Sequence, residues 1–500
     1  FRENIKNGYF PISTDITYNG LFYDYSFDTG NTQIKSNDLF YPSYSTAISK
    51  DLISGQEEYY MSVGLNSNLK ESDFARPKLN LVVVLDNSGS MNSYFNSYYY
   101  DDPYSNNYNV SNKNKMEIAN NAVNTLIDQL NKDDRFGMVV FNSSAQIAKY
   151  LYKISDTNVD NLKENILSIK STGGTNFEDG YQKALDIFKN LDDNNSEYQN
   201  RIIVITDAMP NIGTTLSSDL SKMVENSSKN GIYTTFIGVC LDFNTELIEK
   251  LGTVEGANYY SVHSEEEFKK QMDDDFDYMV TPLVFDLNLN FKSNDYSLEA
   301  VYGTDTENNK KGNVMHVNTL FPSRRNDTGE VKGGIILLKL KRQNNSDNGK
   351  ITLEVTYRDT KNKNYQNSQD VTFNREGEYY DNTGIRKGIL LTRYANLLKD
   401  WILYERSDGN DKFLITDETG IIAPPFLESE VISILGEHER TSVKLTVSDR
   451  FQNLFKEMKN YFETEINELN DNDLNQEIDI LEKLIEVTRK SQNIDEEYNN

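Results

Sequence analysis

The sequence predicts a multidomain chain in which an α/β domain with a doubly wound, Rossmann-like parallel sheet is inserted in an antiparallel β-sandwich and followed by a helical region. Three observations lead to this fold class. Apolar strand-like runs alternate with helix-like segments between residues 79 and 280, as a doubly wound sheet requires. On both sides of that part, apolar and polar residues alternate with a period of two, as in antiparallel strands. The length of 500 residues also exceeds what a single core supports.

The first segment, residues 1–78, reads as strands and contains no predicted helix. Alternate apolar residues, beginning with Tyr59 and Met61, would share one face of a strand. These strands are too few to form a stable sheet by themselves. We therefore expect them to pair with strands of residues 281–374, so that the two halves of the sandwich flank the inserted domain of residues 79–280.

The α/β domain opens with LNLVVVLDNSGSM, in which the apolar run Leu81–Leu85 ends in Asp86 and is followed by Ser88 and Ser90. An unbroken aliphatic run is typical of a buried parallel strand, and ligands bind at the C-terminal ends of such strands. One carboxylate and two hydroxyls are oxygen ligands that suit Mg²⁺ better than Zn²⁺. For the isolated motif, the alternative is a strand-to-helix turn in which serine caps the helix.

Two later loops bring further oxygen ligands and argue against that alternative. In STGGTNFEDG, Gly173 and Gly174 form a flexible loop, Thr175 offers a hydroxyl, and a helix begins near Asn176. In RIIVITDAMPNIG, a second apolar strand ends in Asp207. The sequence therefore predicts a metal site at the strand ends. Its predicted ligands are Asp86, Ser88, Ser90, Thr175 and Asp207.

This pattern resembles the von Willebrand factor type A family, whose metal-ion-dependent adhesion site (MIDAS) consists of D-x-S-x-S, a distant Thr and a distant Asp. The resemblance covers residues 79–272, and one departure is Ala208, where the family often has Gly. It implies a bound Mg²⁺, with Mn²⁺ or Ca²⁺ as alternatives, whose coordination is completed by a Glu or Asp of a partner protein. It also implies that Thr175 moves towards the metal when a ligand binds, and that the helix near Ser264–Met272 shifts with it.

A Tyr-rich and Asn-rich insertion lies between residues 91 and 115. Rigid aromatic rings next to adaptable hydrogen-bonding groups are typical of recognition loops. Because the insertion follows the D-x-S-x-S motif directly, we expect it to overhang the metal and to contact the partner. The alternative is a neutral loop expansion. The tyrosines predicted to bind the partner are Tyr94, Tyr98, Tyr99, Tyr100, Tyr104 and Tyr108.

Strand patterns return in residues 281–374, and residues 375–500 are predicted to be mainly helical. In KGILLTRYANLLKDWILYER, apolar residues from Ile389 to Trp401 recur three and four apart and form one helix face. The segments MVTPLVFDLNLNF and LGEHERTSVKLTVSDRFQNLF resemble the flanking regions of a bacterial von Willebrand A group labelled "calcium-activated chloride channel homologue". No pore-forming segment supports the channel label.

Composition narrows the classes of partner. A net charge of −27 argues against binding to nucleic acid or to an anionic membrane surface. No apolar stretch reaches the roughly 18 residues that a membrane helix needs. One cysteine and three histidines argue against a disulfide framework and a zinc site. We expect a protein that acts outside the cell, at the cell surface or in the periplasm, after removal of a signal or anchor.

The predicted function is that of a metal-dependent protein-binding module and not of an enzyme. One alternative is an intracellular scaffold for an AAA-type ATPase. Another is a Mg²⁺-dependent hydrolase that uses carboxylates such as Glu178 and Asp179. The sequence offers no phosphate-binding loop, no nucleophile elbow and no nucleophile paired with a base, which disfavours catalysis.

Overall fold

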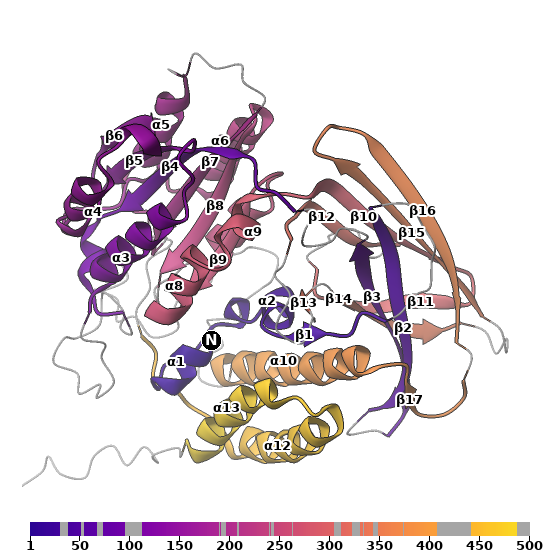
Figure 1. Ribbon diagram of the computed structural model, residues 1–500. Helices are drawn as coiled ribbons and strands as arrows, with labels where there is room; N and C mark the ends of the chain where they lie inside the picture. The colour runs from indigo at the N-terminus through magenta and orange to yellow at the C-terminus, as the bar shows by residue number, and fades with distance from the viewer. Residues whose placement is uncertain are drawn as a thin grey trace, which may run out of the picture.

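The computed structural model describes residues 1–30, 39–51, 55–67, 74–95, 113–189, 191, 197–207, 210–239, 241, 245–262, 264–304, 312–322, 331–333, 335–343, 349–373, 375–407 and 442–487. Three parts are visible in Figure 1: an α/β domain, a pair of antiparallel sheets beside it, and a layer of helices beneath both. The multidomain mixed α/β architecture predicted from the sequence is confirmed. The bounds of the four predicted domains stay a prediction.

The α/β domain is built on a six-stranded sheet with the order β6-β5-β4-β7-β8-β9. All neighbours are parallel except β5 and β6, which are antiparallel. The predicted doubly wound sheet is therefore present, with one antiparallel strand at its edge, because the short β5–β6 connection can only form a hairpin. The strands are β4 (Lys78–Asp86), β5 (Arg135–Phe141), β6 (Ala145–Lys153), β7 (Tyr198–Thr206), β8 (Ile232–Val239) and β9 (Asn258–Val262).

Helices cover both faces of this sheet, so its central strands are buried on both sides. Val83 and Leu85 of β4 belong to one hydrophobic cluster, with α3, α4, α8 and α9. Val82 and Val84 belong to the opposite cluster, with α5, α6 and α7. This explains the unbroken aliphatic run. The helices are α3 (Lys115–Asp128), α4 (Val159–Leu167), α5 (Phe177–Lys189), α6 (Ser217–Lys229), α7 (Thr245–Gly252), α8 (Glu265–Met272) and α9 (Phe276–Val280).

The antiparallel part contains a five-stranded sheet, β11-β14-β3-β2-β17, and a four-stranded sheet, β12-β10-β15-β16. β3 pairs with β14, with Met61 opposite Leu338, so the expected pairing of N-terminal strands with later strands is present. Met61, Leu289 and Leu353 share one hydrophobic cluster that joins the two sheets. The strands are β2 (Phe40–Lys50), β3 (Glu57–Ser67), β10 (Val284–Ser293), β11 (Tyr296–Tyr302), β12 (Asn313–Leu320), β14 (Ile335–Arg342), β15 (Lys350–Asp359), β16 (Asn364–Thr372) and β17 (Tyr379–Tyr380). A separate two-stranded sheet pairs β1 (Ser26–Phe27) with β13 (Val331–Lys332).

The N-terminal segment also contains helices, which corrects the expectation that it has none. Its two α-helices, Arg2–Lys6 and Tyr18–Tyr23, are less than two turns long, too short for a helical period to appear in the sequence. They pack against the C-terminal helices, and Ile5, Leu21 and Trp401 lie in one cluster. The helices of this layer are α1 (Arg2–Lys6), α2 (Tyr18–Tyr23), α10 (Thr383–Ser407), α12 (Asp449–Leu469) and α13 (Asn475–Glu486). In the part of the chain that the structure describes, no helix is long and apolar enough to cross a membrane.

Candidate metal site at the strand ends

The two predicted aspartate ligands lie at the same edge of the α/β sheet. Asp86 is the last residue of β4, and Asp207 follows β7 directly. β4 and β7 are parallel neighbours with Leu85 opposite Ile205, so their carboxyl ends bring the two carboxylates together. Both aspartates are fully buried.

The two serines lie in the turn that follows β4, which contains a short 3-10 helix (Gly89–Asn92). The hydroxyl of Ser90 donates a hydrogen bond to Asp207 Oδ1 at 3.1 Å, and the Ser88 and Ser90 hydroxyls are 3.0 Å apart. Ser88 occupies the N-cap position of this turn, but its side chain makes no capping hydrogen bond. The Ser88 hydroxyl therefore faces the aspartates and does not serve as a helix cap.

The third loop is tied to the other two by backbone hydrogen bonds. Gly89 N donates to Gly173 O at 2.9 Å, which joins the serine turn to the glycine loop before Thr175. Gly173 has a φ of 78°, a left-handed conformation that glycine adopts without strain. Thr175 N donates to Asn211 Oδ1 at 2.8 Å, and Asn211 N returns a bond to Thr175 O at 3.0 Å. Thr175 is buried, like the four other predicted ligands.

The site concentrates negative charge away from water. Burial, and then the neighbouring Asp207, raise the pKa of Asp86 to about 7. Two hydrogen bonds to Asp86 lower its pKa. Thr206 Oγ1 donates to Asp86 Oδ2 at 2.6 Å, and Ser88 N donates to Asp86 Oδ1 at 2.8 Å. Like charges in a low-dielectric site repel each other strongly, so a nearby cation stabilises two such carboxylates.

Sequence reasoning missed Lys115, which supplies one such cation. Its Nζ donates to Asp207 Oδ2 at 3.1 Å, and neither side chain is exposed to solvent. Lys115 begins α3, and its position three and four residues before Ile118 and Ala119 places it on that helix's apolar face. A lysine within an apolar stripe was the signal that could have revealed it. Thr206 was missed as well, because it is the last residue of an apolar strand and belongs to no motif.

The donor set fits a hard divalent ion. The side chains offer two carboxylates and three hydroxyls, all oxygen donors, and Mg²⁺ and Ca²⁺ are bound by such donors. Within the described ranges, no group of three or more His, Cys, Asp and Glu residues could hold a metal. The site therefore depends on its hydroxyls as much as on its carboxylates.

The acidic residues considered for catalysis have structural contacts. Glu178 Oε2 accepts a hydrogen bond from Thr214 N at 2.9 Å. Asp179 Oδ2 accepts one from Ala145 N at 2.6 Å. Each carboxylate therefore holds the backbone of a neighbouring segment, which supports a structural role for both.

Of the tyrosines predicted to bind the partner, Tyr94 is described. Its side chain is 53% exposed, and its backbone forms an isolated bridge with Asn114, just before α3. The role of this insertion stays a prediction. The other five, Tyr98, Tyr99, Tyr100, Tyr104 and Tyr108, lie outside the described residues.

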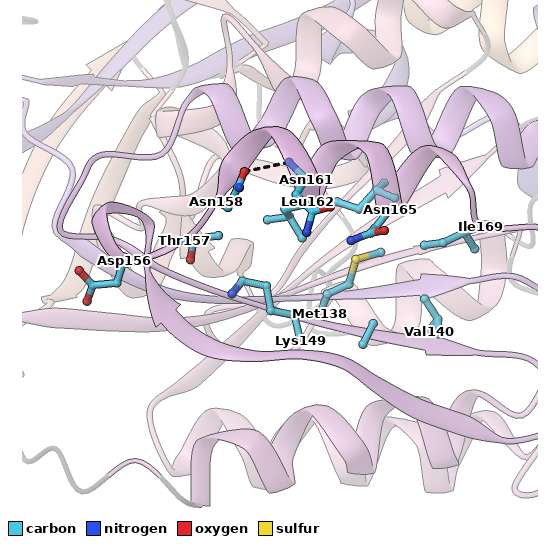
Figure 2. Close-up of a pocket in the computed structure, with 12 residues that line it drawn as sticks. Met138, Val140, Lys149, Asp156, Thr157, Asn158, Asn161, Leu162, Asn165 and Ile169 are labelled. Carbon is cyan, nitrogen blue, oxygen red and sulfur yellow. Dashed lines mark hydrogen bonds between the residues drawn. The ribbon is translucent and has the colours of Figure 1, made fainter.

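A hollow of about 400 Å³ lies between α4 and the strands β5 and β6 (Figure 2). Its lining mixes apolar side chains such as Met138 and Leu162 with asparagines of α4, among them Asn165. Asn158 Oδ1 accepts a hydrogen bond from Asn161 N at 3.0 Å at the start of that helix. None of the five predicted metal ligands lines this hollow, so it is separate from the candidate metal site.

Residues 81–209 match the family profile described as von Willebrand factor type A domain. This chain contains a von Willebrand factor type A domain. The matched segment runs from β4 to just beyond β7 and includes all five predicted ligands. The likeness of the flanking regions to the chloride channel homologue group stays a prediction.

The relatives share this domain. Inter-alpha-trypsin inhibitor heavy chain H4 of Homo sapiens is 27% identical over 223 residues, which cover 43% of this chain and 21% of the heavy chain. Heavy chain H2 of Mus musculus is 24% identical over 181 residues, which cover 35% of this chain and 19% of the heavy chain. The matches therefore span only about a fifth of each heavy chain.

Among solved structures, a von Willebrand factor type A protein from Catenulispora acidiphila is similar with a TM-score of 0.41 and 14% identity, over 73% of this chain and 82% of that chain. The ArnB paralog VWA2 from Sulfolobus acidocaldarius gives a TM-score of 0.38 and 13% identity, over 89% of this chain and 97% of that one. Likenesses of this size support no conclusion on function.

Proposed function

We propose that the von Willebrand factor type A domain of this chain is a metal-dependent protein-binding module. Its Mg²⁺ would be held at a MIDAS by the two aspartates and three hydroxyl residues, and a Glu or Asp of the partner would complete the coordination. The observation that carries this proposal is that two buried carboxylates meet the hydroxyls of one serine turn at a single sheet edge, with the glycine loop before Thr175 hydrogen-bonded to that turn. The proposed ligands are Asp86, Ser88, Ser90, Thr175 and Asp207.

Hydrogen bonds from surrounding residues hold the proposed ligands in position. Thr206 fixes one oxygen of Asp86, and the backbone N–H of Ser88 fixes the other. Asn211 holds the Thr175 loop next to the strand end that carries Asp207. When bound, the ion supplies a positively charged coordination position for an outside carboxylate. Because the proposed ligands include few carboxylates and several neutral hydroxyls, the ion keeps part of its positive charge and attracts an anion to that position.

The donor set favours Mg²⁺ over Ca²⁺, with Mn²⁺ as the close alternative. Ca²⁺ takes 6–8 oxygen ligands, often including a bidentate carboxylate, whereas Mg²⁺ binds fewer protein oxygens in an octahedron and keeps waters. Neutral hydroxyls from Ser88, Ser90 and Thr175 leave room for one outside oxygen in such an octahedron. The net charge of −27 supports a partner that carries its acidic side chain on an otherwise basic surface.

Neither alternative function has an observation in its favour. The carboxylates of Glu178 and Asp179 hold backbone N–H groups, which argues against their use as the base of a hydrolase. No described feature points to an ATPase. A place outside the cell, at its surface or in the periplasm, is part of the proposal and fits the adhesive role.

Replacing Thr175 by Val is expected to lower the Mg²⁺ affinity at least about tenfold, because it removes one oxygen donor and leaves the side-chain shape nearly unchanged. Isothermal titration calorimetry measures the effect. The matched control is Thr157→Val, whose hydroxyl bonds Lys153 O outside the site. Equal Mg²⁺ affinities in wild type, Thr175→Val and Thr157→Val would remove Thr175 from the proposed site.

A further inference from the structure

The buried lysine of the candidate metal site has a position that helix stability does not explain. Lys115 is the first residue of α3, and its helix end is closed by a capping box between Asn114 and Glu117. Cations at a helix N-terminus are disfavoured by the helix dipole. Burying an ammonium group is also unfavourable unless a counter-charge compensates it. The contact with Asp207 supplies a buried counter-charge for Lys115.

Asp207 connects the lysine with the proposed metal ligands. Its Oδ1 accepts the hydrogen bond from the Ser90 hydroxyl, and its Oδ2 accepts the one from Lys115 Nζ. One oxygen of the Asp207 carboxylate thus contacts the proposed metal ligand Ser90, and the other contacts the positive charge of Lys115. Because all of these groups are buried, the charges interact with little screening by solvent.

The charge balance of the site changes with this lysine. Asp86 and Asp207 together bring two negative charges as ionised carboxylates, which Mg²⁺ alone would neutralise. With the ammonium of Lys115 included, the metal-loaded site carries one surplus positive charge. The lysine therefore weakens the binding of Mg²⁺ when no partner is present. Once Mg²⁺ is bound, the surplus positive charge favours the binding of an anionic ligand.

We propose that Lys115 is a built-in cation that lowers the Mg²⁺ affinity of the free domain and couples metal retention to the binding of a partner carboxylate. This inference rests on the proposed metal-dependent binding function and adds its regulation. Coupling of this kind is reciprocal, so an acidic partner must raise the affinity for Mg²⁺ by the same factor by which Mg²⁺ raises the affinity for the partner.

Titration calorimetry with Mg²⁺ on the full chain tests the first half of this proposal. We expect Lys115→Met to bind Mg²⁺ at least about tenfold more tightly than wild type. Lys115→Arg, which keeps the charge, is expected to stay close to wild type. The matched control is Lys387→Met, because Lys387 is also buried and ion-paired, with Asp471, but lies in the helical layer. If Lys115→Met binds Mg²⁺ no more tightly than wild type, the proposal is overturned.

Acetate, used as a minimal carboxylate, tests the second half. We expect acetate to raise the apparent Mg²⁺ affinity of wild type more than that of Lys115→Met, and an equal effect in both proteins contradicts the coupling. Lys115→Gln provides a second neutral variant if the Met variant does not fold, as judged by circular dichroism. If wild type and Asp86→Asn show the same Mg²⁺ binding, or none, the proposed metal site itself fails. If wild type instead binds Mg²⁺ and Lys115→Met binds it with the same affinity, only the proposed role of the lysine fails.

Discussion

Asp207→Ala is expected to destabilise the von Willebrand factor type A domain by about 3–5 kcal/mol, because the buried ammonium of Lys115 loses its carboxylate. The substitution also relieves the repulsion between Asp207 and Asp86, which offsets part of the loss. The net effect corresponds to a fall in the melting temperature of this domain on the order of 10 °C. Differential scanning calorimetry in EDTA measures it without any contribution from metal.

The double variant Asp207→Ala with Lys115→Met provides the matched test of this explanation. Removing the unpaired charge is expected to recover most of the lost stability, so the two substitutions must be strongly non-additive. Additive losses, or a loss below about 1 kcal/mol in the single variant, would show that the ion pair is not an important stabilising contact in the site.

Asp86→Asn is expected to abolish the response to Mg²⁺ and yet to stabilise the metal-free protein at pH 8. The raised pKa of Asp86, about 7 against an ordinary value of 3.8, means that the folded protein binds its proton more tightly than the unfolded chain. Stability from this group is fully present below the ordinary value and is lost as the pH rises through about 7. The neutral amide avoids that loss, on the order of 2–4 kcal/mol.

Melting temperatures in EDTA and in Mg²⁺, at pH 5 and pH 8, measure both effects. Wild type in EDTA should melt lower at pH 8 than Asp86→Asn does, and Mg²⁺ should raise the melting temperature of wild type but not that of Asp86→Asn. Asp133→Ala, at an exposed aspartate paired with Lys153, is the control and should respond to Mg²⁺ as wild type does. If Mg²⁺ raises the melting temperature of Asp86→Asn as much as that of wild type, Asp86 is not a ligand of the metal.

The places of the predicted ligands in the fold could be read from the sequence, because each of them follows or ends a recognisable element. Asp86 and Asp207 end apolar strand runs, and a parallel sheet brings such ends to one edge. Thr175 follows two glycines in a loop that closes on the serine turn. The strand pattern of residues 281–374 was equally readable, because one face of each strand is buried.

The remaining features depend on tertiary contacts that no local pattern records. Lys115 could not be assigned a partner, because Asp207 is far from it in sequence and meets it only when α3 packs on the sheet. Asn211 and Thr206 act through hydrogen bonds to residues that other segments supply. The helices at Arg2–Lys6 and Tyr18–Tyr23 are too short to show a period, and packing against α10 and α13 stabilises them.

The most direct test of the central claim is the capture of partner proteins from the surface and soluble fractions of the source organism. The full chain is used as bait in Mg²⁺ and again in EDTA, with Asp86→Asn and Asp133→Ala alongside. A metal-bridged binding module predicts a partner that wild type and Asp133→Ala retain in Mg²⁺, and that is lost both in EDTA and with Asp86→Asn. A partner that persists in EDTA and with Asp86→Asn would contradict the claim and move recognition to the Tyr-rich insertion or to the flanking domains.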